Sequence, residues 1–125
     1  MLSERGAERL KEILSFIERV EISLVELDVG DYTTYLADTK AQDILERNIL
    51  RIAEAAAKIG FEELEALTPE APWRSLYAMA NRLRHGYDRV DHAIVWDTWE
   101  SDFPVLRKAA EQAFAKVNKT STDPL

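Results

Sequence analysis

The chain contains no cysteine, which excludes disulfides, thiol catalysis and zinc sites built from cysteine. It also lacks an apolar run that approaches the roughly 20 residues needed to cross a bilayer. The segment from Met1 to Glu8 is charged and has none of the apolar character of a signal peptide. We therefore expect a soluble, cytoplasmic protein that does not contact a membrane.

Internal repeats, low-complexity tracts and the alternating pattern of β-strands are absent as well. A length of 125 residues is enough for one buried core but too short for two. We expect a single domain over residues 1–117, followed by a polar C-terminal tail over residues 118–125.

Apolar residues recur at intervals of three and four, which is the spacing of amphipathic helices. The pattern predicts helices from Ser3 to Leu27, from Tyr35 or Asp38 to Ile59, from Pro72 to about Arg84, and from near Asp91 to about Val117. One helical turn is expected between Phe61 and Pro72, and a kink or a restart capped by Asp102 is expected at Pro104. The last helix should turn a set of apolar residues inward: Ile94, Val95, Trp99, Leu106, Ala110, Ala113 and Phe114. These elements predict an all-α, up-and-down bundle of four or five helices.

The charge is unevenly distributed. The chain carries a net charge of −7, which disfavours a broad nucleic-acid-binding surface. From Ala71 to His92, however, four arginines face only two aspartates, so this segment carries +2 and the remainder −9. A small basic island of this kind suits a local contact with phosphate.

The reactive side chains concentrate in residues 81–91, around His85. Asn81 and His85 are four residues apart and share a helix face, Ala80 and Arg84 form a neighbouring strip, and Gly86 ends the helix. An imidazole beside an amide and arginines can act as general acid or base in phosphodiester cleavage, with the arginine neutralising charge on phosphorus. RNA brings its own 2′-hydroxyl nucleophile, so no metal or other cofactor is required. A helix-capping or structural histidine is the alternative that spacing alone leaves open.

Several segments resemble the HepT family of the HEPN superfamily: Pro72-Trp73, residues 80–91, Ile94-Val-Trp96, Asp102-Phe-Pro104, and Gln42 to Asn48 continuing to Ala55. The similarity spans roughly residues 4–113. It implies a small all-helical toxin that is a metal-independent ribonuclease, with its active site at the junction of two subunits.

The family motif is an arginine, four residues, a histidine, one residue and a tyrosine. The resemblance implies that His85 is the catalytic histidine, that Asn81 is the polar residue after the arginine, and that Tyr87 is the tyrosine. It also implies a partner, a minimal nucleotidyltransferase antitoxin of the MntA type. That partner would adenylylate Tyr87, placing negative charge and bulk beside the phosphate site.

The chain departs from the motif at Ala80, where the family has its phosphate-holding arginine. Alanine cannot supply the fork of donors that grips a phosphate. Three explanations are open, in order of preference: the arginine was replaced deliberately because an active toxin is hard to express, it was lost naturally, or Arg84 reaches back along the helix in its place. The departure predicts a weak or inactive nuclease.

A non-catalytic binding module is the alternative function. In that case the motif survives only as a docking and modification surface for the nucleotidyltransferase. Two further interpretations are made from the pattern. Trp73, Trp96 and Trp99 are expected to anchor the core or an interface, and Arg47 with Asn48 suggests either a dimer contact or a hydrogen bond at the bundle edge.

Overall fold

The computed structural model describes residues 4–86 and 90–121, and within these ranges the regular structure is entirely helical. The elements follow the chain in this order: α1 (Glu4–Glu26), α2 (Tyr32–Leu36), α3 (Thr39–Ile59), α4 (Phe61–Leu67), α5 (Trp73–His85), α6 (His92–Asp97), a π-helical turn η1 (Thr98–Asp102) and α7 (Phe103–Ser121). The predicted all-α bundle is confirmed.

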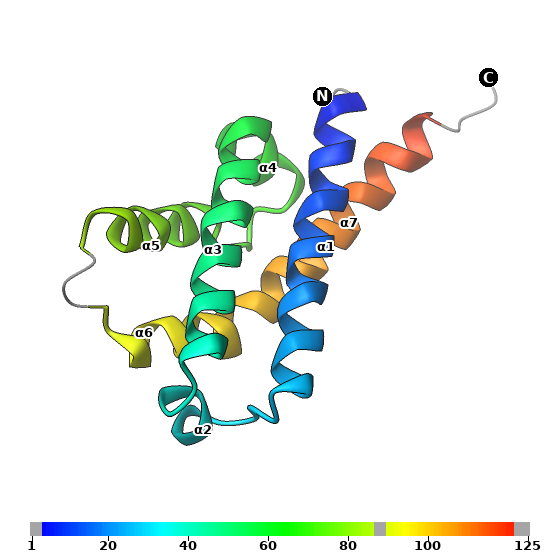
Figure 1. Ribbon diagram of the computed structural model, residues 1–125. Helices are drawn as coiled ribbons and strands as arrows, with labels where there is room; N and C mark the ends of the chain where they lie inside the picture. Colours follow the sequence, from blue (N-terminus) through cyan, green and yellow to red (C-terminus); the bar gives the residue numbers. More distant parts are fainter. Residues whose placement is uncertain (1–3, 87–89, 122–125) are drawn as a thin grey trace.

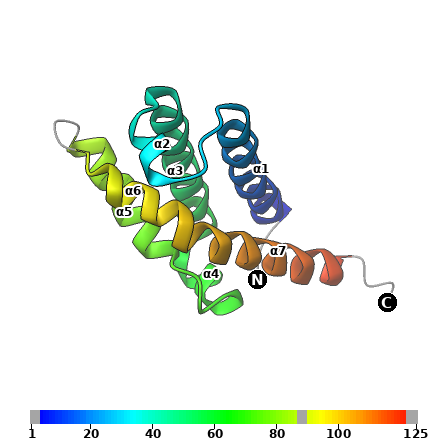
Figure 2. The ribbon, with the colours of Figure 1, turned by 90° about the horizontal axis from the view of Figure 1, so that it is seen from below.

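The helix α3 lies at the centre of the bundle. It runs antiparallel to α1 on one side and packs against α5 on the other, while α7 crosses α1 (Figures 1 and 2). The apolar stripe of α1 faces this core through Leu10, Ile13, Ile17, Val20 and Leu24, all buried. Burying one such side chain contributes about 1.5–3 kcal/mol, so the stripe fixes which face of α1 meets α3.

The predicted ends of α3 are confirmed and have local causes. The Asp38 carboxylate accepts a hydrogen bond from the Ala41 N–H at 2.9 Å and caps the start of the helix. Gly60 ends it with φ 109°, a backbone conformation that disfavours any residue with a Cβ, and donates its N–H to the Ala56 carbonyl.

Of the two short helices that flank α3, the sequence did not predict the first and predicted the second as a single turn. The turn between α1 and α3 contains α2, which starts with a capping box: the Thr34 N–H donates to Asp31 at 2.8 Å, and the Thr34 hydroxyl accepts the Asp31 N–H. After Gly60, the expected single turn is the seven-residue helix α4.

The last predicted helix is interrupted just before Pro104, but not by a restart capped by Asp102. The chain instead widens into η1, in which the Phe103 N–H donates to the Thr98 carbonyl. This i to i−5 bond accommodates the missing donor of Pro104 without ending the helix. Among the residues predicted to point inward, the prediction for Ile94 is wrong, since this side chain is 45% exposed. Helix α7 also continues to Ser121, past the expected end at Val117.

The three tryptophans pack as the sequence predicted. Trp73 is fully buried and donates its indole N–H to the Thr68 hydroxyl at 3.1 Å, while Trp96 is buried and Trp99 half-buried. Over the described part of the chain, no helix is both long and apolar enough to span a bilayer.

Candidate active site

His85 is the last residue of α5, and its side chain is exposed. The Gly86 N–H closes the helix by donating to the Arg82 carbonyl at 2.8 Å. A Cβ at Gly86 would lie 3.0 Å from that same carbonyl oxygen, so glycine allows the chain to leave the helix here without crowding. The helix therefore ends directly after His85, as predicted, and presents the imidazole at its C-terminus.

Asn81 and Arg84 form a pair on the same last turns of α5. The Arg84 Nη1 donates to the Asn81 Oδ1 at 3.0 Å, and both side chains are half-buried. Arg84 thus reaches back along the helix in the direction that the sequence predicted, but it reaches Asn81. The positive side chains of Arg82 and Arg84 also lie at the negative end of the helix dipole, which stabilises them.

Position 80 lies on the inner face of α5. Ala80 is fully buried and belongs to the hydrophobic core. Its place on the helix is therefore filled by packing and leaves no open vacancy for Arg84 to occupy. An arginine at this position would have to carry its guanidinium out of the core to reach a phosphate.

The remaining motif residues follow α5. Tyr87, the expected adenylylation site, lies outside the described residues. Asp91 caps α6, where its carboxylate accepts hydrogen bonds from the N–H groups of Ala93 at 3.0 Å and Ile94 at 3.4 Å. This cap fixes the point at which the chain returns to the bundle after the His85 segment.

A cluster of titratable side chains behind the start of α6 was not predicted. His92 Nδ1 lies 3.8 Å from a carboxylate oxygen of Glu46, and the His92 ring meets the edge of the buried Tyr35 ring, with 6.2 Å between centroids. Burial raises the pKa of Glu46, an effect that His92 opposes and Asp43 reinforces. Burial, followed by the nearby charge of Glu46, raises the pKa of Tyr35. Tyr35, Glu46 and His92 come from three different helices, so no local sequence pattern could have revealed the cluster.

Asn48 makes the hydrogen bond that was one of its two predicted roles. It is 2% exposed, and its Nδ2 donates to the Ile44 carbonyl at 2.7 Å. Arg47, one residue earlier, is exposed. The predicted dimer contact of these two residues stays a prediction. Metal-ligating residues are not gathered in the described part of the chain, where no three His, Cys, Asp or Glu side chains meet.

The chain is similar to known proteins over most of its length. The family model described as Ribonuclease HepT-like matches residues 7–113. A protein of Thermococcus cleftensis named "Probable ribonuclease HepT" is 33% identical over 103 residues, which cover 82% of this chain and 90% of that protein. "Putative RNase MJ0125" of Methanocaldococcus jannaschii is 26% identical over 103 residues, covering 82% of this chain and 85% of that protein. No solved structure gave a significant match. The exposed His85 at the end of α5 thus lies within the matched range, and the chain belongs to the HepT-like ribonuclease family.

Proposed function

We propose that the chain is a metal-independent endoribonuclease in which His85 acts as the general acid or base. One observation carries the proposal: the His85 imidazole is exposed at the end of α5, directly after Arg84 and one turn after Asn81, whose side chains are paired with each other. In RNA the 2′-hydroxyl can attack the adjacent phosphorus, and the 5′-oxygen leaves. An imidazole at this point would take the proton from the nucleophile or return one to the leaving oxygen.

Asn81 and Arg84 would hold the phosphate. Because the Asn81 Oδ1 accepts the bond from Arg84, its NH₂ group is the part that can donate to a phosphate oxygen. The guanidinium of Arg84 is held by the same bond and supplies positive charge where the transition state gains negative charge. The lost arginine at Ala80 would leave this site weak or inactive.

The biological role belongs to the same proposal. The chain would be the cytoplasmic toxin of a toxin–antitoxin pair, inhibited by a minimal nucleotidyltransferase of the MntA type. It would act as a homodimer with two His85 motifs facing one cleft. Apolar side chains at the surface are compatible with such pairing: Val25 is 80% exposed, Ile22 50% and Leu36 49%.

The second candidate is a binding module without catalysis. The buried, fully packed Ala80 favours it, because the phosphate-holding arginine is missing and its place is closed. The chain would then serve as partner and modification substrate of the nucleotidyltransferase.

Restoring the arginine separates the two candidates. Ala80→Arg is compared with Ala78→Arg, which makes the same substitution at an exposed position of the same helix. Growth arrest on expression, or RNA cleavage in EDTA, by Ala80→Arg but not by Ala78→Arg supports the nuclease. A folded Ala80→Arg chain that leaves RNA intact at high concentration favours the binding module.

Modification of Tyr87 is tested separately. Incubation with a minimal nucleotidyltransferase and ATP should add nucleotide mass to the peptide that contains Tyr87. A Tyr87→Phe chain that is labelled equally well would show that another residue is the acceptor.

A further inference from the structure

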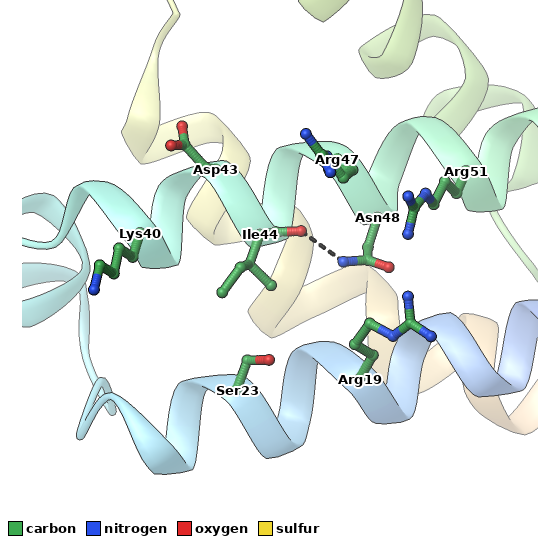
Figure 3. Close-up of a pocket in the computed structure, with 8 residues that line it drawn as sticks. All are labelled: Arg19, Ser23, Lys40, Asp43, Ile44, Arg47, Asn48 and Arg51. Atoms are coloured by element: carbon green, nitrogen blue, oxygen red, sulfur yellow. Dashed lines mark hydrogen bonds between the residues drawn. The ribbon is translucent and has the colours of Figure 1, made fainter.

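A hollow of about 470 Å³ lies between α1 and α3, apart from the His85 end of α5 (Figure 3). Its volume falls within the range of pockets that hold small ligands. Arg19 and Ser23 of α1 form one wall, and α3 contributes the other: Lys40, Asp43, Ile44, Arg47, Asn48 and Arg51. We call this hollow the α1–α3 groove.

The α1–α3 groove is positively charged although the chain as a whole is acidic. Three arginines and one lysine line it, against the single carboxylate of Asp43. Within the described ranges, no carboxylate lies within ion-pair distance of Arg19, Arg47 or Arg51. The guanidinium of Arg51 instead lies 5.9 Å from the centre of the Phe16 ring. Guanidinium groups that line one hollow without a carboxylate partner favour a phosphate ligand, which their donor geometry matches.

Asn48 adds an acceptor to this positive groove. Its Nδ2 is bound to the Ile44 carbonyl, which can only accept, so the orientation of the amide is fixed. The Oδ1 is buried and has no hydrogen-bond partner among the described residues. Figure 3 shows it on the side of Asn48 toward Arg51, above the guanidinium of Arg19. A buried acceptor without a partner is costly, so this oxygen suits a ligand that brings a donor.

A ribonucleotide unit satisfies both requirements, because it carries a phosphate and a hydroxyl donor a few ångströms apart. We propose that the α1–α3 groove binds a ribose-phosphate unit of the RNA chain, with Arg19 and Arg51 on the phosphate and Asn48 accepting from the 2′-hydroxyl. DNA lacks that hydroxyl, so the groove would select RNA. This inference rests on the proposed ribonuclease function and gives its substrate a second contact, away from His85.

The first test measures binding of a fluorescein-labelled oligoribonucleotide to the intact chain by anisotropy in EDTA. The double variant Arg19→Gln/Arg51→Gln should weaken binding roughly tenfold, since each arginine makes a charge-assisted contact. The slope of log K against log salt should fall by about 0.7 for each lost phosphate contact. The matched control is Arg5→Gln/Arg9→Gln, which removes the same charge from the N-terminal turns of α1. Arg5 lies 14 residues before Arg19, about 21 Å along the helix.

The second test examines the role of Asn48. The intact chain should bind the oligoribonucleotide several-fold more tightly than the matching oligodeoxynucleotide or the 2′-O-methyl oligoribonucleotide. The methyl group removes the donor and needs no change in the protein. In Asn48→Leu this preference should disappear.

The outcomes separate this inference from the proposed function. Equal affinity of the two arginine double variants for RNA, or no preference for the 2′-hydroxyl in the intact chain, would overturn the groove assignment even if His85 cleaves RNA. Displacement of the oligonucleotide by AMP at equal affinity would reassign the groove to a free nucleotide and overturn the assignment to RNA. Conversely, binding that depends on Arg19 and Arg51, in a chain that leaves RNA intact even after Ala80→Arg, would support the groove and refute the nuclease.

Discussion

Arg84 and Asn81 are joined by a 3.0 Å hydrogen bond on the last turns of α5, beside the exposed His85. The bond settles which end of the Asn81 amide faces outward as a donor. It also holds the guanidinium of Arg84 against Asn81, one turn before His85. Under the proposed function, both effects prepare this end of the helix to bind a phosphate.

Loss of Arg84 should therefore impair RNA cleavage. In an Ala80→Arg background, Arg84→Gln is expected to lower kcat/KM by roughly 10- to 100-fold, because it removes a donor aimed at developing charge. Arg82→Gln, which removes the same charge from an exposed position nearby, should have a much smaller effect. Equal losses in the two variants would mean that only the overall charge matters. Initial rates on a defined RNA oligonucleotide measure both.

Restoring arginine at position 80 should cost stability. Ala80 is fully buried, and inserting a long side chain into a packed core costs roughly 1–3 kcal/mol. Ala78→Arg, at an exposed position, should change the free energy of unfolding by no more than about 0.5 kcal/mol. Urea unfolding followed by circular dichroism measures both values. An Ala80→Arg chain as stable as Ala78→Arg would show that the guanidinium leaves the core without disturbing it.

The Tyr35 hydroxyl should contribute nothing favourable to folding. It is buried and lacks a hydrogen-bond partner in the described ranges, while its ring stacks on Trp96 with 4.9 Å between centroids. Tyr35→Phe is expected to leave the free energy of unfolding unchanged or to raise it by about 1 kcal/mol. Tyr35→Ala should lower it by about 3–5 kcal/mol, because the ring packing is lost. A clear loss of stability in Tyr35→Phe would show that the hydroxyl does have a partner.

Stability should depend on pH through Glu46. Burial raises the pKa of this carboxyl above its ordinary value of 4.5, so the folded chain holds the proton more tightly than the unfolded chain. The favourable contribution is complete below pH 4.5 and is lost as the pH rises through the raised pKa. Glu46→Gln should therefore stabilise the chain at pH 7 and have little effect at pH 4.

The exposed Glu12 provides the control for this prediction, and Glu12→Gln should change the free energy of unfolding by no more than about 0.5 kcal/mol. Thermal unfolding between pH 4 and pH 8 measures both variants. If Glu46→Gln were less stable than the unaltered chain at pH 7, the contact of the Glu46 carboxylate with His92 would outweigh the cost of burial.

The sequence predicted those parts of the fold that depend on local signals. The stripe from Leu10 to Leu24, the stop at Gly60 and the start of a helix near Asp91 all lie where the pattern placed them, and Asp38 was one of the two predicted starts of α3. The helix α2 was missed because it has only five residues, too few for a periodic pattern. The π-helical turn before Pro104 was missed, because the sequence shows only that Pro104 lacks a donor and not how the helix accommodates its absence.

The same distinction between local signals and packing applies to the candidate sites. The residues around His85 could be found because they are neighbours on one helix. The α1–α3 groove could not, because Arg19 and Arg51 come from different helices and meet only through the packing of α1 on α3. Asn48 within an apolar stripe was the one visible signal, and its unpaired oxygen appears only in the structure.

The most direct measurement of the central claim compares Ala80→Arg with Ala80→Arg/His85→Gln on a defined RNA oligonucleotide in EDTA. We predict that the first chain cleaves the RNA and that the second loses at least about 100-fold of that activity, since general acid–base catalysis typically contributes this much. Cleavage at the same rate by both chains would contradict the assignment of His85.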